Sequence, residues 1–345
     1  MKYTKPTRLV PGDTVAVVSP SWGGPSIFPH IYENGLKVLR DFGLQIKEFP
    51  TARTPADFLA RHPEVRAKDI NDAFADTQIK AIFASIGGDD SVRILPFLNN
   101  EVIQSNPKIL MGYSDTTTLL TYINQLGMVT FHGPSIMAGF SQTESLPESF
   151  TQHVQRMLFS PKEELEYRSF ELYCDGYLDW SKEENLGKTK ELRKDTGWRF
   201  IQGNGIARGE LYGGCLEVLE SLNGTDFWAG KDFWNGKILF FETSEEKPSI
   251  QRVRRMLRNY GMQGIFAKAV AVLFGRARDY TDEEKVELDE MIIDVIEGEF
   301  GNGNIPIVTN MDFGHTDPQF ILPLGVKAEL DCSNRSFKLV ESPLT

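Results

Sequence analysis

The first 135 residues alternate between short apolar runs and segments of helical periodicity, with few residues between them. Runs such as "TVAVVSP", "IKAIFAS" and "KILMGYS" are dense in apolar residues, as strands buried on both faces are. Segments such as "IYENGLKVLRDFG" and "VRAKDINDAFAD" repeat their apolar residues at the spacing of a helix. Strands and helices in alternation build a parallel sheet covered by helices on both faces, so the chain is predicted to be an α/β protein.

The chain is long enough for a second domain. Its 345 residues exceed what one hydrophobic core usually serves. From about residue 136 to 205 the alternation stops, and the segment becomes dense in charge and poor in apolar periodicity, as a connection or a lid would be. The pattern predicts an amino-terminal domain over 1–165, a connecting segment or lid over 166–205, and a second α/β domain over 206–345.

The second domain has its own strand and helix signals. "GELYGGCLEVLESLNGT" carries leucines at helical spacing, and "KILFFE", "KAVAVLFG" and "IPIVTNM" are predicted strands. "SIQRVRRMLRNYGM" and "DEEKVELDEMIIDVIEGEF" are predicted helices. The closing "VKAELDCSNRSFKLVES" is predicted to form a hairpin with its turn near residues 333–335.

Composition narrows the class of ligand. The formal net charge is −11, which disfavours a nucleic acid or an anionic membrane as partner and leaves a small molecule as the expected ligand. No stretch reaches about 18 uninterrupted apolar residues, and the first 20 residues hold no long apolar segment. Three scattered cysteines fit neither a disulfide framework nor a metal site and are expected to be reduced. A cytoplasmic location is expected.

Four polar or glycine-rich loops follow the predicted strands of the first domain. They span residues 19–24, 87–91, 112–115 and 132–134. Because parallel strands end at the same edge of a sheet, these loops are expected to lie along one rim, where open α/β sheets bind their ligands.

Ser114 lies between a predicted strand and the helix that begins "DTTT". A serine at such a turn can expose its hydroxyl while backbone N–H groups at the start of the helix point toward the same space. The alternative is that Ser114 or Asp115 only caps the helix. The surrounding "GYSDT" is not the G-x-S-x-G elbow of α/β-hydrolases, because Thr116 replaces the second glycine.

A nucleophilic serine needs a base, and histidine is the usual one. His315 follows the strand "IVTNM" in a polar loop, which makes it a candidate base or a structural residue. His132 lies at the rim beside Ser114 and is either a second candidate base or a residue that lines the ligand site. His153 lies in a charged helical stretch and is expected at the surface.

Glu242 ends the apolar strand "KILFFE", where a charge is costly unless it is paired. It could orient the imidazole, or it could be a strand-end residue turned to water. Glu245 and Glu246, which follow in the next loop, are expected to face water.

The glycines of "SIGGDDS" lack the spacing of a phosphate-binding loop. Adjacent glycines at a strand end instead let a carbonyl oxygen approach backbone N–H groups, so the amides of Gly88 and Asp115 are predicted to form an oxyanion hole. No pattern of metal ligands is present, and neither a metal nor an organic cofactor is expected.

Taken together, the motifs resemble those of the LD-carboxypeptidases and microcin C immunity proteins, a family of serine peptidases with a Ser-Glu-His triad. The resemblance is carried by "LVPGDTVAVVSPS", "SIGGDDS", "MGYSDTTTLL", "GELYGGCLEVLESLNGT", "ILFFETSEE" and "VTNMDFGHTDP", in the family's order along nearly the whole chain. It implies a flavodoxin- or Rossmann-like parallel-sheet domain joined to a smaller carboxyl-terminal α/β domain, and it implies a homodimer.

The resemblance assigns the catalytic roles residue by residue. It makes Ser114 the nucleophile, Glu242 the orienting carboxylate and His315 the general base. The inserted segment before "GELYGGCLE" is similar to that of the immunity branch, in which a tryptophan stacks on adenine. Trp180 matches that tryptophan by position, although it could equally anchor a domain interface, and Trp198 could be a packing residue.

Three functions are compatible with these residues. The favoured one is a microcin C immunity-like hydrolase that cleaves the amide bond of aminoacyl-adenylate mimics. The first alternative is a murein tetrapeptide LD-carboxypeptidase with the same triad. The second is a small-molecule binding protein without catalytic activity.

Overall fold

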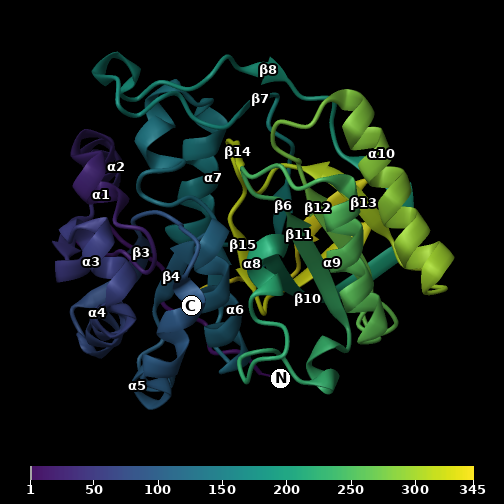
Figure 1. The fold of residues 1–345 in the computed structure, drawn as a ribbon, viewed down its shortest axis with the longest axis horizontal. Coiled ribbons are helices and arrows are strands. Elements are labelled where there is room, and N and C mark those ends of the chain that lie inside the picture. Colours follow the sequence, from purple (N-terminus) through teal and green to yellow (C-terminus); the bar gives the residue numbers. More distant parts are fainter. Residues whose placement is uncertain (1) are drawn as a thin grey trace.

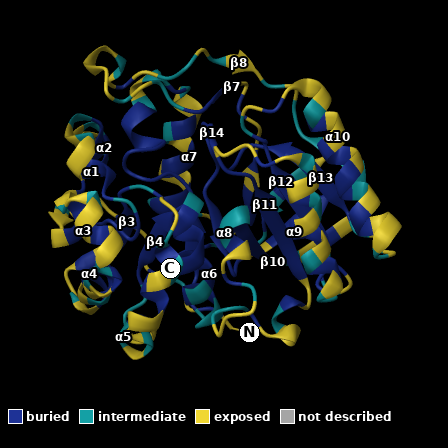
Figure 2. Ribbon diagram, in the orientation of Figure 1, coloured by how far each residue is buried: buried dark blue, intermediate teal, exposed yellow. Residues whose placement is uncertain are grey.

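The computed structural model describes residues 2–345 and has the predicted α/β class (Figure 1). The amino-terminal half lies on one side, the carboxyl-terminal half lies on the other, and the chain from about residue 165 to 205 spans them. One continuous hydrophobic cluster includes residues of both halves. Figure 2 shows this burial along the strands between the two groups of helices.

The amino-terminal sheet has five parallel strands in the predicted places. They are β1 (Thr14–Val18), β2 (Gln45–Glu48), β3 (Ile79–Ala84), β4 (Ile109–Gly112) and β5 (Thr130–His132). A sixth strand, β15 (Leu322–Leu324), comes from the far end of the chain and pairs antiparallel with β5. The order is β15-β5-β4-β3-β1-β2. The longer helices of this half are α2 (Pro29–Asp41), α4 (Pro63–Ala75), α6 (Thr117–Gln125) and α7 (Glu148–Leu158).

The carboxyl-terminal sheet has eight strands around a parallel centre. The parallel strands are β10 (Ile206–Cys215), β11 (Lys237–Glu242), β12 (Ala271–Gly275) and β13 (Ile307–Met311). Antiparallel strands flank them: β6 (Leu165–Tyr167), β9 (Arg199–Gln202), β16 (Lys327–Asp331) and β17 (Ser336–Leu339). The predicted closing hairpin is therefore confirmed. The longer helices here are α9 (Ile250–Met262) and α10 (Asp282–Ile293).

One prediction within this half was wrong in part. The leucine spacing of "GELYGGCLEVLESLNGT" indicated a helix, but only α8 (Leu216–Glu220) is helical and the residues before it belong to β10. The glycines explain the difference. A Cβ on Gly213 would lie 1.7 Å from the carbonyl oxygen of Phe240 in β11, so only glycine lets the two backbones pair this closely.

The segment 166–205 is tied into the rest of the structure. Its strand β7 (Leu172–Asp175) pairs with β8 (Arg193–Lys194) and with β14 (Thr316–Asp317), and β9 joins the carboxyl-terminal sheet. The division into 1–165, 166–205 and 206–345 stays a prediction, since strands cross these limits in both directions.

A buried ion pair fastens this segment to the carboxyl-terminal sheet. The Arg276 guanidinium is fully buried and lies 2.8 Å from Asp312 and 3.2 Å from Asp195. Trp198 donates its indole N–H to the other oxygen of Asp312 at 2.7 Å. Asp312 therefore satisfies a buried cation and holds the segment in place at once, and Trp198 packs beside it.

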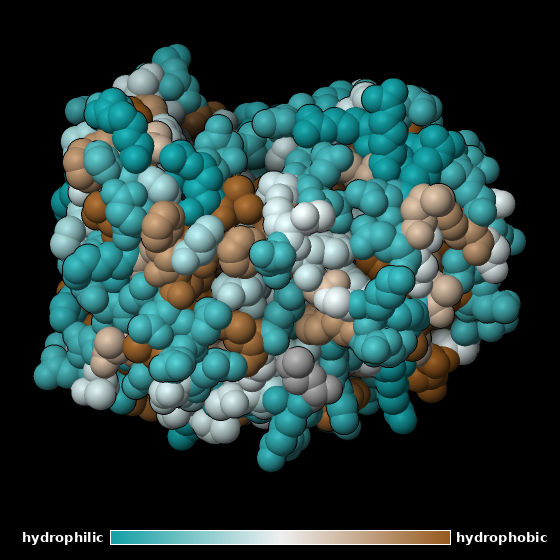
Figure 3. Space-filling view, turned by 60° about the horizontal axis from the view of Figure 1, so that its bottom comes forward, coloured by the Kyte–Doolittle hydropathy of each residue, from teal (hydrophilic) through white to brown (hydrophobic). Residues whose placement is uncertain are grey.

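Within the described residues, every helix is too short or too polar to cross a bilayer. On the face drawn in Figure 3, apolar side chains lie scattered among hydrophilic ones.

Replacing Asp312 with alanine should destabilise the fold strongly. The change leaves a buried guanidinium short of a counter-ion, which costs roughly 3 to 5 kcal/mol of unfolding free energy. Urea denaturation measures the difference. Asp232→Ala is the control, because Asp232 is 99% exposed and lies 3.8 Å from Lys268, and it should change the stability by less than about 0.5 kcal/mol. Equal effects of the two variants would contradict a structural role for the Asp312 pair.

Candidate active site

Ser114 begins a 3₁₀ turn, Ser114–Thr116, between β4 and α6. Its φ of +56° is in the left-handed region, which costs a residue other than glycine about 1 kcal/mol or more. Neither the turn nor α6 has a side-chain cap hydrogen bond in the described structure, so nothing there supports the capping alternative. The strained turn leaves the Ser114 side chain half-buried at the rim of the sheet.

The glycine-rich loop after β3 lies directly against this turn. A Cβ on Gly87 would lie 2.9 Å from Ser114 Oγ and 3.3 Å from the Asp115 nitrogen. A Cβ on Gly88 would lie 2.1 Å from Ser21 Oγ, and its φ is +153°. Glycine at position 87 therefore lets the loop backbone approach Ser114, and glycine at position 88 lets it pack against Ser21. A close approach of the loop backbone to Ser114 is what an oxyanion hole at this point requires.

Asp115 fixes the loop in this place. Its buried carboxylate accepts the Ser91 backbone N–H at 2.8 Å, and its carbonyl oxygen accepts the Ser91 hydroxyl at 2.6 Å. Burial raises the pKa of the Asp115 carboxyl. The side chain is thus used for structure, and the backbone N–H is the part that remains for an anion.

Glu242 and His315 form a buried pair at the end of the carboxyl-terminal sheet. Glu242 ends β11, His315 follows β13, and Oε2 of the carboxylate lies 2.6 Å from Nδ1 of the ring. The exposed fractions of the two side chains are 0% and 2%. Gly314 permits this approach, because a Cβ on it would lie 2.7 Å from Glu242 Oε2. The alternative in which Glu242 faces water is wrong, since the charge is paired.

Glu245 lies on the other side of the same imidazole. Its Oε2 is 3.0 Å from Nε2 of His315, although 54% of the Glu245 side chain is exposed. The prediction that Glu245 faces water is therefore confirmed, but one of its oxygens also faces the imidazole, which was not predicted. The loop after β11 turns back over His315, and this turn has no mark in the sequence.

The two carboxylates govern the charge of the ring. Burial lowers the pKa of His315, but the charge and hydrogen bond of Glu242, followed by those of Glu245, raise it to about 10. The contact with His315 lowers the pKa of Glu245 to about 2. In this arrangement His315 is a cation at neutral pH.

One cavity of about 380 Å³ brings the candidate residues together. Ser114, His315 and Trp180 all line it, and so does Gly88. A second cavity of about 150 Å³ adjoins it and also includes Ser114, Asp115 and Gly88 in its lining. Ser114 and His315 have no hydrogen bond between them in the described structure, which is common where catalytic contacts tighten only around a substrate.

Trp180 is half-buried at the wall of the larger cavity. Its ring lies 5.4 Å from that of Tyr177 and 5.7 Å from that of Phe28, and its carbonyl oxygen lies 2.8 Å from His30 Nε2. One side of the residue therefore joins the inserted segment to the amino-terminal half. Both expectations for Trp180, an aromatic platform and an interface anchor, are compatible with this position.

His132 lies behind the cavity. It is fully buried, its ring is 6.2 Å from Tyr113 and 5.4 Å from Phe240, and it does not line either cavity. Burial lowers its pKa to about 4, so the ring is neutral at pH 7. A part for His132 in ligand binding stays a prediction, and any such part would act through Tyr113.

His153 is not at the surface, as its charged helix suggested. Only 2% of it is exposed, and Nε2 accepts the Ile321 backbone N–H at 2.8 Å. His153 is on the face of α7 that packs inward. The charged residues of the same helix, Glu148 and Arg156, made the whole segment look like a surface helix.

Sequence reasoning missed a polar group at the base of the cavity. Tyr113 and Tyr177 share a hydrogen bond between their hydroxyls, and Arg278 lies 5.3 Å from the Tyr177 ring. Asp317 is buried with both carboxyl oxygens unpaired among the described residues, and burial raises its pKa to about 6. Tyr113 is part of "GYSD" and Asp317 follows "DFGH" closely, but nothing in the sequence connects Tyr177 or Arg278 with either motif.

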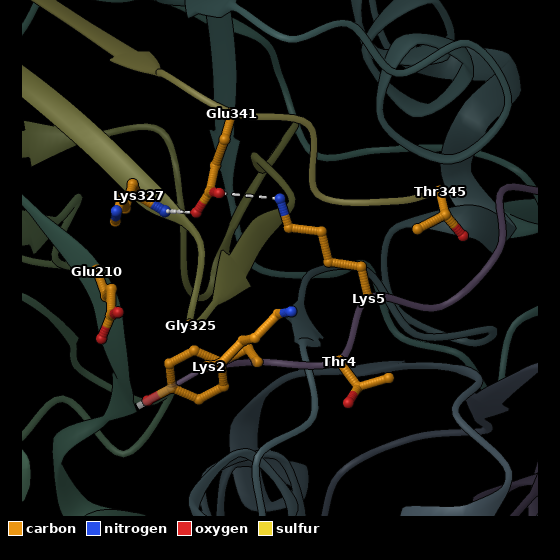
Figure 4. A pocket seen from close by; sticks show the side chains of 9 residues that line it. Lys2, Thr4, Lys5, Glu210, Gly325, Lys327, Glu341 and Thr345 are labelled. Atoms are coloured by element: carbon orange, nitrogen blue, oxygen red, sulfur yellow. Dashed lines mark hydrogen bonds and ion pairs between the residues drawn. The ribbon is translucent and has the colours of Figure 1, made fainter.

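Other candidate sites are weaker. No group of three or more His, Cys, Asp or Glu side chains in residues 2–345 is arranged to hold a metal ion. A larger cavity, about 840 Å³, lies between the chain ends and shares no lining residue with the Ser114 cavities. Figure 4 shows that Glu341 there already accepts from Lys5 Nζ at 3.0 Å and from the Lys327 backbone N–H at 2.8 Å. Among the described residues that line it there is no serine or cysteine and no histidine, so it offers no candidate nucleophile with a base.

Comparison with protein families gives two matches. Residues 15–133 match the LD-carboxypeptidase N-terminal domain, and residues 208–330 match the LD-carboxypeptidase C-terminal domain. The matched ranges include Ser114, Glu242 and His315.

Individual relatives match along nearly their whole length. The microcin C7 self-immunity protein MccF of Escherichia coli is 28% identical over 98% of this chain and 96% of its own. A probable murein peptide carboxypeptidase of Bacillus subtilis is 29% identical over 96% of this chain and 93% of its own.

Solved structures agree with the fold. An MccF-like protein from Streptococcus pneumoniae in complex with AMP superposes with a TM-score of 0.85, at 31% identity, over 95% of this chain and 98% of its own. MccF in complex with aspartyl sulfamoyl adenosine gives a TM-score of 0.86 at 27% identity, over 99% of this chain and 100% of its own.

Replacing Gly314 with alanine should disrupt the Glu242–His315 pair. The Cβ would collide with Glu242, so we expect a loss of roughly 1 to 3 kcal/mol from overpacking in addition to the backbone strain at φ +96°. Gly301→Ala is the matched control, because Gly301 has φ +71° and nothing within 4 Å of its Cβ position. Its cost should be the strain alone, about 1 kcal/mol. Equal losses of unfolding free energy in urea denaturation would show that the backbone at residue 314 can move away from Glu242 at little cost.

Proposed function

Because the chain belongs to the LD-carboxypeptidase family, we propose that it is a serine hydrolase of the microcin C immunity type, which cleaves the amide bond of aminoacyl-adenylate mimics. The observation that carries the proposal is one cavity lined by Ser114, His315 and Trp180. Behind it, Glu242 is hydrogen-bonded to Nδ1 of His315, which leaves Nε2 as the nitrogen that can take a proton from Ser114. Nucleophile, base, orienting carboxylate and an aromatic wall thus belong to one site.

The proposed reaction follows the chemistry of serine acyl transfer. Ser114 Oγ attacks the carbonyl carbon and gives its proton to Nε2 of His315, while Glu242 holds the Nδ1–H and stabilises the cation. The backbone N–H groups of Gly88 and Asp115 stabilise the oxyanion. His315 returns the proton to the leaving amine, and water then hydrolyses the acyl-serine by the same base.

The aromatic side chain of Trp180 at the wall of the cavity is an argument for a substrate with a nucleotide-like leaving group. MccF binds aspartyl sulfamoyl adenosine, and its relative from Streptococcus pneumoniae binds AMP. A base stacked on an aromatic side chain gains about 1 to 3 kcal/mol, and Trp180 is the tryptophan of the inserted segment that lines the cavity here.

Murein tetrapeptide cleavage is the second candidate function. The same triad could catalyse it. The Bacillus subtilis relative is named a probable murein peptide carboxypeptidase, and it is about as similar to this chain as MccF is. The third candidate is a binding protein without catalysis. It does not explain why Ser114 is held in a strained backbone conformation, which is typical of catalytic residues.

We also propose a cytoplasmic location and a homodimer. The three cysteines are all free, which suits a reducing compartment. Light scattering after size-exclusion chromatography measures the oligomeric state.

Ser114→Ala should lower kcat by several orders of magnitude while the protein stays folded. Aspartyl sulfamoyl adenosine is the substrate to use in steady-state kinetics, and circular dichroism checks the fold. Ser221→Ala is the matched control, because Ser221 lines the smaller cavity but is exposed and donates only to the Val218 carbonyl. It should keep near wild-type kcat. Turnover by the Ser114 variant would rule out the serine mechanism.

Trp180→Ala should separate the two substrate classes. Loss of stacking should lower kcat/KM for aspartyl sulfamoyl adenosine roughly 5- to 150-fold, which corresponds to about 1 to 3 kcal/mol, and leave a murein tetrapeptide little affected. Trp180→Phe should restore most of the loss. An equal loss for both substrates would indicate that Trp180 anchors the inserted segment and does not bind the nucleobase.

A further inference from the structure

The Nε2 atom of His315 already lies at ion-pair distance from a carboxylate, although the two are not aligned as a hydrogen bond. In the proposed mechanism this nitrogen accepts the Ser114 proton, yet its neighbour here is Oε2 of Glu245 at 3.0 Å. Glu245 lines both cavities beside Ser114, so its carboxylate lies where a substrate would approach the serine.

Two carboxylates on one imidazole fix its protonation. Glu242 Oε2 is hydrogen-bonded to Nδ1 at 2.6 Å, and Glu245 Oε2 lies 3.0 Å from Nε2. A carboxylate this close to each ring nitrogen favours the form in which both nitrogens carry a proton. Such a cation has no lone pair for the proton of Ser114. In agreement, the described structure has no hydrogen bond between Ser114 and His315.

We propose that Glu245 is an autoinhibitory carboxylate, which holds His315 as a cation and has to leave Nε2 before Ser114 can attack. This inference rests on the proposed function, because it assumes that His315 is the base. Entry of substrate into the cavity would displace Glu245, and the base would be released only when there is something to cleave.

The surroundings allow Glu245 to move while Glu242 stays. Glu242 is fully buried, whereas more than half of the Glu245 side chain is exposed. The loop itself is held by other residues: Glu246 lies 3.4 Å from Arg252, and Lys247 lies 2.8 Å from Glu284. Rotation of one exposed side chain therefore frees Nε2 without moving the backbone.

Several other groups face His315 and stay in place when Glu245 changes. Tyr113, directly after β4, lies with its ring 5.0 Å away, and Arg278, after β12, lines the same cavity. The charge of Asp317 in β14 and that of His132 in β5 also interact with His315. With the two carboxylates, the titratable and charged groups around His315 among the described residues are Glu242, Glu245, Tyr113, His132, Arg278 and Asp317.

The sign of the pH effect follows from the pair. Glu245 helps to raise the pKa of His315 to about 10, so the ring keeps its proton through neutral pH. Removal of one carboxylate should lower that pKa by about one unit or more, as a neighbouring charge commonly shifts it. Any step that needs neutral His315 would then begin at lower pH.

The first test is the titration of His315 by NMR in protein with ¹⁵N-labelled histidine, with the signal assigned from its loss in His315→Gln. We expect the pKa in Glu245→Gln to be lower than in the wild type by about one unit or more. Glu246→Gln is the matched control, since Glu246 lines the same cavities from the same loop without contact to His315, and it should titrate like the wild type. An unchanged His315 pKa in Glu245→Gln and in Glu245→Ala overturns the proposal.

The second test is the rate at which a fluorophosphonate labels Ser114 at pH 7. Glu245→Gln should be labelled at least about tenfold faster than the wild type, as a one-unit fall in pKa implies, and its acid limb of kcat/KM should move to lower pH. Slower labelling at every pH overturns the proposal, because Glu245 would then assist the base. If no form is labelled, the serine mechanism fails, and the NMR titration alone decides whether Glu245 holds the cation.

Discussion

The hydrogen bond between Glu242 and His315 is the constraint around which the two strand ends at the candidate site are arranged. A carboxylate with no exposed surface at the end of a strand is tolerated only if a cation or strong donors face it. The chain meets this need by bringing the exit of β13 against the end of β11. That approach requires Gly275 as well as Gly314, since a Cβ on Gly275 would lie 3.0 Å from the Glu242 Cβ. Burial of Glu242 against His315 therefore requires glycine at both positions, in "LFG" and in "DFGH".

The same segment joins the two halves of the molecule. After His315 the chain forms β14 against the inserted segment and then β15 against β5 of the amino-terminal sheet. Strand β5 neighbours β4, whose end carries Ser114. His315 and Ser114 are thus connected through the short chain segment from His315 to β15 and through two strand pairings. The strain at Ser114 lies within this framework, where packing on both sides can hold it.

The sequence predicted what depends on regular patterns. Parallel strands, their order of appearance and the closing hairpin follow from apolar periodicity, and the loop that carries Ser114 follows from where a strand ends. Prediction from the sequence failed where a residue's contact partner is distant along the chain. His153 is in a helix with polar and charged residues, as a surface residue would be, but its ring accepts a hydrogen bond from the backbone of Ile321 in the core. The strand β10 was hidden because leucine spacing after it resembles a longer helix, while the close pairing of its glycines with β11 appears only in three dimensions.

Glu242 and Glu245 show how burial divides the tasks of two chemically identical groups. They stand three residues apart and both contact one imidazole, yet water reaches only the second. Screening weakens the contact of an exposed carboxylate and offers it an alternative partner in solvent, whereas a buried one has nowhere else to place its charge. The first is therefore suited to orient the ring permanently, and the second to compete for it reversibly. The difference comes from position alone: Glu242 is the last residue of β11, and Glu245 is on the loop that leaves it.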